Sequence, residues 1–120
     1  MRYTHENSNE LSEYLQTRYI HDGRFQNAVY DQITKEFSIH VENPIWNDSI
    51  DMVFVEVCEF SSISDYKWGD EETINAFVLI TDNDSNAYKD KLRFVWEMFS
   101  GNQIHVVCSE LRISSKAEAL

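Results

Sequence analysis

Carboxylates and histidines are the residues of this 120-residue sequence whose types and spacing could do chemistry. The consecutive carboxylates Asp70-Glu71-Glu72 could bind a divalent cation weakly, but adjacent carboxylates repel one another and need ligands from elsewhere to converge on one ion. His40 and His105 stand at outward positions of predicted strands, and the sequence has no HxH or HxxxH spacing. We therefore predict a solvated acidic loop and surface histidines, with no metal site and no cofactor.

Two further motifs match known metal sites in part. HD phosphohydrolases use a pair such as His21-Asp22, but their metal site also needs His and Asp residues on several helices. Only one helix is predicted here, and a turn that ends it explains the pair. Residues 82–86 (DNDSN) begin like an EF-hand loop, yet position six is Ala87 where the loop wants glycine, and position twelve is Arg93 where it needs a carboxylate. A turn rich in Asp and Asn is the simpler interpretation.

The motifs of nucleophilic and nucleotide chemistry are absent. The sequence has no GxSxG, no P-loop and no GxGxxG, and its three glycines cannot build a loop that cradles a phosphate. Catalytic residues can lie far apart in a sequence, so one hypothesis is an enzyme or metal protein that uses His21, Asp22, His40 and His105.

Negative charge is concentrated in one segment. The net charge is −11, and residues 48–72 alone hold eight carboxylates against one lysine. Such a field repels nucleic acid and anionic membranes and attracts basic partners or cations. We expect a basic protein partner, with no nucleic acid and no membrane among the partners.

An aromatic sequence, Tyr66-Lys67-Trp68-Gly69, lies within this acidic segment. Large aromatic side chains ringed by charge are typical of binding hot spots. An equally good interpretation is that Trp68 packs against the edge of the sheet and is not exposed for binding. The predicted partner-binding residues are Asp65, Tyr66, Trp68, Asp70, Glu71 and Glu72.

The composition predicts a single domain over residues 1–120, with residues 1–8 and 114–120 frayed. Neither a signal peptide nor a run of about 20 apolar residues is present, so we expect a cytoplasmic protein. Cys58 and Cys108 lie in apolar runs without CxxC spacing, and we expect two buried, reduced thiols.

The hydrophobic spacing predicts one helix followed by strands. Leu11, Tyr14, Leu15 and Tyr19 share one face of a helix over residues 9–20. From Arg24 the hydrophobic period changes to two. Six strands are predicted, at residues 24–30, 37–42, 50–60, 74–81, 92–99 and 104–113, the last with a bulge near Ser109. The 50–60 strand is apolar on both faces at its centre, as expected for a long interior strand.

The last two strands predict a hairpin with a three-residue loop. This loop would pair Met98 with Ile104 and Trp96 with Val106, so that apolar residues share one face. The predicted fold is therefore mostly β (α+β), with about six antiparallel strands in a sandwich or curved sheet and one N-terminal helix over a face or an open end.

Several short motifs resemble those of a group of small uncharacterised bacterial proteins. They are His21-Asp22-x-Arg24-Phe25 before a hairpin, Glu42-Asn43-Pro44, Trp68-Gly69 in an acidic loop, and a closing hairpin rich in Phe and Trp. The group begins with an H-D-x-R-hydrophobic strand, and some similar proteins are immunity partners of bacterial toxins. The resemblance covers residues 21–113, brings no catalytic residues and favours a binding function.

The leading hypothesis is an acidic cytoplasmic binding protein, immunity-like, that engages a basic protein partner through the loop at residues 65–72. An alternative is a structural or oligomerising β domain without a ligand, whose apolar strands pair edge to edge. The enzyme or metal protein described above is the second alternative.

Overall fold

The computed structural model describes residues 1–17, 23–43, 47–63, 72–80 and 90–115. Their strands form one open antiparallel sheet of nine strands in the order β1-β9-β4-β3-β2-β6-β7-β8-β5. The elements are β1 (Arg2–Thr4), the 3-10 helix η1 (His5–Asn7), α1 (Ser8–Thr17), β2 (Arg24–Asp31), β3 (Glu36–Asn43), β4 (Asp48–Val55), β5 (Glu59–Ile63), β6 (Glu72–Leu79), β7 (Leu92–Met98), β8 (Gln103–Cys108) and β9 (Glu110–Ser115).

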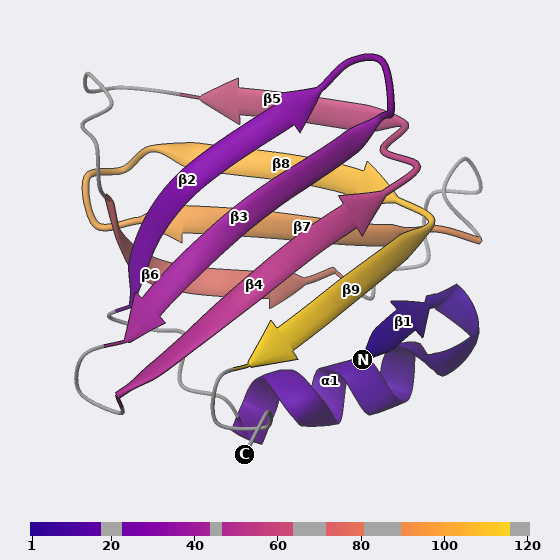
Figure 1. The fold of residues 1–120 in the computed structure, drawn as a ribbon, viewed down its shortest axis with the longest axis horizontal. Helices are drawn as coiled ribbons and strands as arrows, with labels where there is room; N and C mark the ends of the chain where they lie inside the picture. Colours follow the sequence, from indigo (N-terminus) through magenta and orange to yellow (C-terminus); the bar gives the residue numbers. More distant parts are fainter. Residues whose placement is uncertain (18–22, 44–46, 64–71, 81–89, 116–120) are drawn as a thin grey trace.

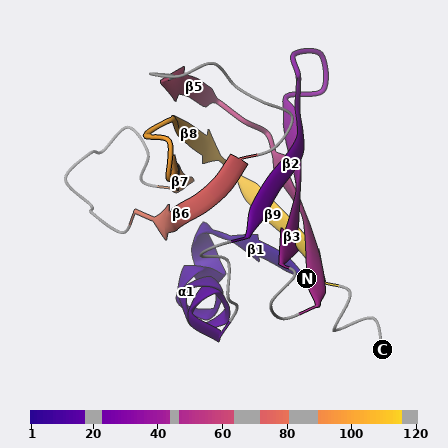
Figure 2. The ribbon, with the colours of Figure 1, turned by 90° about the vertical axis from the view of Figure 1, so that its left-hand side faces the viewer.

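The sheet curves so strongly that its two halves face each other (Figures 1 and 2). We call β1, β9, β4, β3 and β2 the front half, and β6, β7, β8 and β5 the back half. Within the sheet they are joined by a short pairing of β2 with β6, Arg24 opposite Thr73 and Phe25 opposite Glu72. The mostly β class and the N-terminal helix are confirmed. The prediction of about six strands is wrong, and one open sheet replaces the two sheets of a sandwich.

Two of the three extra strands arise at one corner of the sheet, and the third is β1 at the N-terminus. The predicted strand 50–60 breaks after Val55, where Glu56 has a φ of 55°, and the chain passes from β4 in the front half to β5 in the back half. The predicted bulge at Ser109 is the point where β8 passes into β9. The Ser109 N–H donates to the Val55 carbonyl (3.1 Å), and the Cys58 N–H donates to the Val107 carbonyl (2.9 Å). Two neighbouring strands thus bend together at the same place.

Aromatic side chains fill the space between the two halves. Phe54 of β4 meets Phe94 of β7 with ring centroids 5.2 Å apart, and Phe37 of β3 meets Phe60 of β5 at 5.0 Å. Trp96 is fully buried, and Phe77 stacks on it at 3.9 Å. The rings present apolar edges and faces to one another across the core, an arrangement that adds to the burial energy of each pair.

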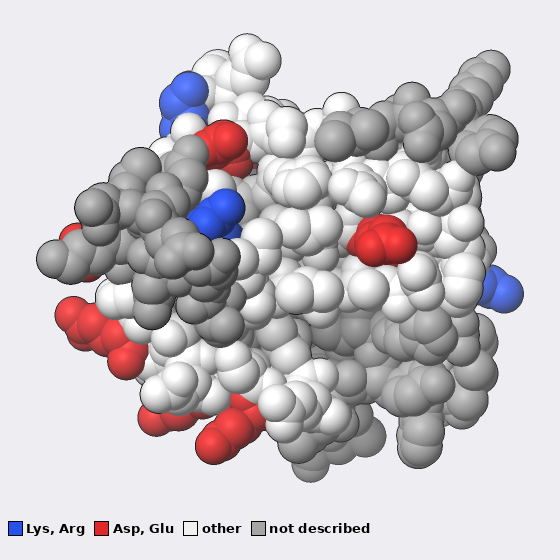
Figure 3. Space-filling model, turned by 180° about the vertical axis from the view of Figure 1, so that it is seen from behind, with Lys and Arg blue, Asp and Glu red and all other residues white. Residues whose placement is uncertain are grey.

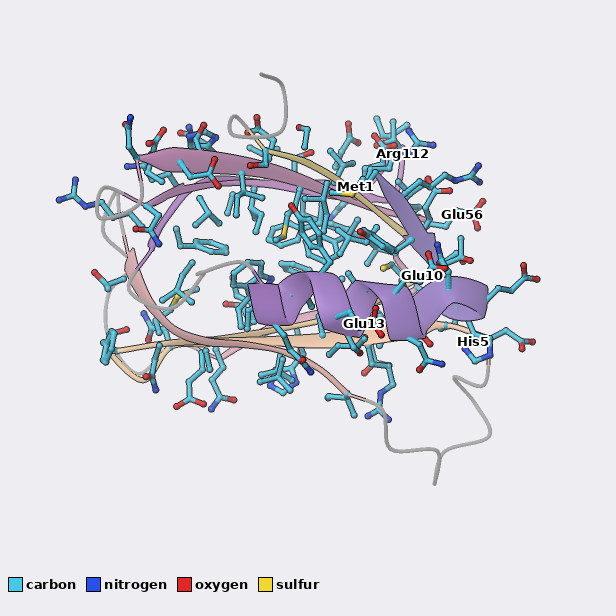
Figure 4. The ribbon with its side chains drawn as sticks, turned by 90° about the horizontal axis from the view of Figure 1, so that it is seen from below. Met1, His5, Glu10, Glu13, Glu56 and Arg112 are labelled. Atoms are coloured by element: carbon cyan, nitrogen blue, oxygen red, sulfur yellow. The ribbon has the colours of Figure 1, made fainter. Side chains whose placement is uncertain are left out.

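The helix α1 covers one open end of the space between the halves, as Figure 4 shows from below. Leu11 is fully buried, and Tyr14 and Leu15 pack against the core. The chain enters through η1, where the Thr4 hydroxyl accepts from the Glu6 N–H and the Thr4 N–H donates to the Asn7 side chain. This reciprocal capping fixes the direction of entry. Neither helix described here has the length and apolarity needed to cross a membrane.

An ion cluster fastens β1 to β9, in a segment for which the sequence predicts no strand. Arg2 and Arg112 are directly opposite in the pairing, and both donate to the buried carboxylate of Glu110. The Arg112 Nε lies 2.5 Å from a Glu110 carboxylate oxygen. Burial raises the pKa of Glu110, but the hydrogen bonds from the two guanidinium groups outweigh it, and the pKa is lowered. The carboxylate therefore stays charged and offsets the repulsion between the two arginines.

The hairpin β7–β8 has the predicted loop length but another register. Trp96 pairs with Ile104 and Phe94 with Val106, two residues away from the predicted pairing. The loop is Phe99-Ser100-Gly101, and Gly101 has a φ of 95°, which glycine adopts without strain. Because the shift is two residues, the predicted buried face is retained.

The corner predicts an unusual order of stability for two substitutions. Glu56→Gly should be more stable than Glu56→Ala by about 1 kcal/mol, because an L-residue with a side chain is strained at this positive φ. At ordinary strand positions the order is reversed. Urea unfolding of the two variants measures the difference, with Glu59→Gly and Glu59→Ala in β5 as the control pair. Equal stability, or a more stable alanine variant at position 56, would contradict the strained corner.

Candidate functional site

The predicted partner-binding residues fall mostly outside the described part of the chain. Asp65, Tyr66, Trp68, Asp70 and Glu71 lie there, as do His21, Asp22 and residues 82–86. Glu72 is described as the first residue of β6, where its backbone pairs with Phe25. The binding loop at residues 65–72 thus stays a prediction.

The described carboxylates of the acidic segment do not form one patch. The carboxylate of Asp48 accepts from the Ser115 hydroxyl at 2.9 Å, whereas Asp51 lies on the outer face of the front half. Glu56 is exposed at the corner, and Glu59 is exposed on β5 in the back half. Their negative charge is spread over several sides of the molecule.

The two strand histidines lie on opposite sides of the molecule. His40 alternates with the buried Ile39 and Val41, so it faces outward from the front half. His105 alternates with the buried Ile104 and Val106 and faces outward from the back half. Because the core lies between them, these two side chains do not form a common catalytic or metal site.

His40 is the centre of a tight polar cluster on the outer face of the front half. Its Nδ1 lies 2.6 Å from a carboxylate oxygen of Asp51, and its Nε2 lies 2.5 Å from a carboxylate oxygen of Glu42. The pairing of β3 with β4 places His40 opposite Asp51, and the strand period places Glu42 on the same face two residues away. The sequence patterns do not predict this cluster, although the His-x-Glu spacing is a visible signal for part of it.

Both ring nitrogens of His40 can donate at once only if the imidazole is protonated. The hydrogen bonds to Asp51 and then Glu42 raise the pKa of His40, and partial burial opposes them weakly. An imidazolium between two carboxylates gives the cluster a net charge of about −1. The exposed fractions of the Glu42 and Asp51 side chains are 47% and 63%, so each carboxylate still reaches water.

The chemistry open to this cluster is recognition of cations rather than metal binding at the imidazole. Both ring nitrogens are occupied, so neither is available as a metal ligand or as a base. In the described ranges, no group of three or more His, Cys, Asp or Glu is arranged to hold a metal ion. The second oxygen of each carboxylate can accept from a lysine or arginine of another protein.

The two cysteines differ from the prediction of two buried thiols. Both are free, but Cys58 is exposed at the corner and only Cys108 is buried. Burial raises the pKa of Cys108 to about 12, which leaves it a poor nucleophile at neutral pH. Cys58 is exposed because it belongs to the bend rather than to a long interior strand.

The comparisons with known proteins assign no family. No family model matches the sequence, and a search of curated proteins finds no match.

The cluster predicts a stability contribution that depends on pH. Because the pKa of His40 is raised in the folded state, this contribution is fully present below about pH 6.5 and is lost as the pH rises through the folded pKa. The difference in unfolding free energy between the wild type and His40→Gln should therefore be larger at pH 6 than at pH 9. Urea unfolding at both values measures it, with His105→Gln as the matched control. A difference that is the same at both pH values would contradict the imidazolium cluster.

Proposed function

We propose that this chain is an acidic binding protein that engages a basic protein partner. The observation that carries the proposal is the pair of half-exposed carboxylates that His40 holds in place on the outer face of the front half. Cross-strand neighbours of the cluster include Gln26 and Ser114, which add polar groups to the same surface. A fixed carboxylate binds a cation at a lower entropy cost than a free one.

The charge of the whole chain supports the same kind of partner. A net charge of −11 on 120 residues steers positively charged proteins toward the surface and raises association rates at low salt. The predicted loop at residues 65–72 supplies the apolar anchor Trp68 beside further carboxylates. In this proposal the loop gives affinity and the His40 cluster gives charge complementarity.

An immunity-like role fits this combination. In the proposal the protein works in the cytoplasm of a bacterial cell, a reducing compartment in which Cys58 and Cys108 stay thiols. The partner would be a basic toxin or nuclease, whose positive surface the chain covers. Such a protein needs a rigid surface and no catalytic residues.

The proposal predicts a ranking of binding defects. A low-salt pull-down with the tagged protein, followed by a stepwise salt wash, isolates the partner, and titration calorimetry with that purified partner measures affinity. Trp68→Ala should weaken binding more than any single carboxylate substitution, by tenfold or more, because aromatic anchors dominate interfaces. Asp51→Asn should weaken binding more than Glu13→Gln, which removes the same charge from the exposed face of α1.

Two results would contradict the proposal. Equal affinity of Trp68→Ala and the wild type would remove the predicted loop as the binding site. Equal effects of Asp51→Asn and Glu13→Gln would show that net charge alone, and not the His40 cluster, attracts the partner.

A further inference from the structure

The outer face of the back half differs in chemistry from the rest of this acidic protein. Residues 73–79, 92–98 and 103–108 contain only two side chains with a full charge, Arg93 and Glu97. Figure 3 views this side and shows a broad area with few charged side chains. These parts of β6, β7 and β8 therefore carry a net charge near zero in a chain of −11. The other carboxylates of the back-half strands are Glu72, the first residue of β6, and Glu59 on the edge strand β5.

Apolar side chains occupy the middle of this face. Phe94, Trp96 and Met98 of β7 are buried, so the alternate residues Arg93, Val95 and Glu97 face outward. Val95 lies opposite Val78 on β6 and opposite His105 on β8, which in turn lies opposite Ser61 on β5. Val78 is 49% exposed. Water-facing sheet positions are usually polar, so valines in the central row mark a surface suited to contact with another protein.

The pattern of charge on β7 indicates what this face contacts. A basic partner would be drawn to the carboxylates on other surfaces and gains little here. Along β7 the outward residues are positive, apolar and negative in turn: Arg93, Val95 and Glu97. If a second copy of β7 faces this row in the opposite direction, each positive residue meets a negative one and the two valines meet. A two-fold dimer requires a surface that is complementary to itself after a rotation of 180°.

We propose that the outer face of the back half binds the same face of a second copy of this chain. A two-fold axis that passes between the copies at Val95, perpendicular to β7, places Val95 against Val95. Alternate strand residues are about 7 Å apart, so the same axis places Arg93 of each copy against Glu97 of the other. Both ion pairs and the valine contact form together in this arrangement.

The size of the face sets the strength of the dimer. Four strands at a spacing of about 4.8 Å, each with about six residues of 3.3 Å, cover roughly 400 Å² per copy. The pair would bury about 800 Å², below the roughly 1,200 Å² of stable complexes. The dimer is therefore expected to be weak and reversible, in the class of transient contacts. The carboxylates of the front half lie away from this interface, which limits the repulsion between two copies of charge −11.

Sedimentation equilibrium of the full chain from about 1 μM to 1 mM tests the proposal. The wild type should show a concentration-dependent monomer–dimer equilibrium. Val95→Glu places two carboxylates at the axis and should leave the protein monomeric over the whole range. The matched control is Val53→Glu, which puts the same charge at an outward, partly buried valine of β4 in the front half and should dimerise like the wild type.

A charge exchange tests the register of the contact and does not depend on the folding of the valine variant. Arg93→Glu and Glu97→Arg should each weaken the dimer several-fold, because like charges then face each other across the axis. The double variant should regain most of the lost affinity. A wild type that stays monomeric up to 1 mM would overturn the proposal. A dimer that persists in Val95→Glu would also overturn it, because such a dimer would form elsewhere, for example by pairing at the β5 edge. So would a double variant that dimerises no more tightly than the single variants.

Discussion

The structure depends on one corner, where two paired strands leave the front half of the sheet and enter the back half together. The hydrogen bonds from Ser109 to Val55 and from Cys58 to Val107 keep the two chains paired through this bend. A third bond, from the Val57 N–H to the Lys35 carbonyl, ties the same bend to the turn between β2 and β3. Backbone groups that would otherwise lose their partners at a sharp bend are thereby satisfied.

The corner creates the core because it sets one half of the sheet over the other. Phe54 comes just before the bend on β4, and its ring meets Phe94 and Phe77 of the back half. The inner faces are thus used for packing, which leaves the two outer faces for contact with other molecules. Those faces differ: the front half presents carboxylates held by His40, and the back half presents valines between one positive and one negative residue. The contacts proposed for the His40 cluster and for the second copy would lie on opposite sides of the molecule.

Local patterns in the sequence predict the helix, the hairpin of β2 and β3, and the buried face of most strands. They do not predict the corner. Phe54 and Phe60 are an even number of residues apart, so an alternating pattern places both on the same face of one long strand. In the structure both point inward, but from different halves of the sheet. Val57, buried at the opposite parity, was the one local sign of a bend. Near Ser109 the apolar residues change from even to odd positions, which the sequence shows. A bulge and a corner both cause this shift in the alternation, so the sequence does not distinguish them. The His40 cluster needed the pairing of β3 with β4, which no local pattern determines.

Native-state hydrogen exchange of the amides of Cys58 and Ser109 tests most directly whether the corner is the constraint on which the fold depends. If it is, both amides exchange only through global unfolding, and their free energy of exchange equals the free energy of unfolding measured by urea. The amide of Ile33, in the exposed turn between β2 and β3, should exchange much faster and serves as the internal reference. Exchange of Cys58 and Ser109 through local opening, at a free energy well below that of unfolding, would contradict the account.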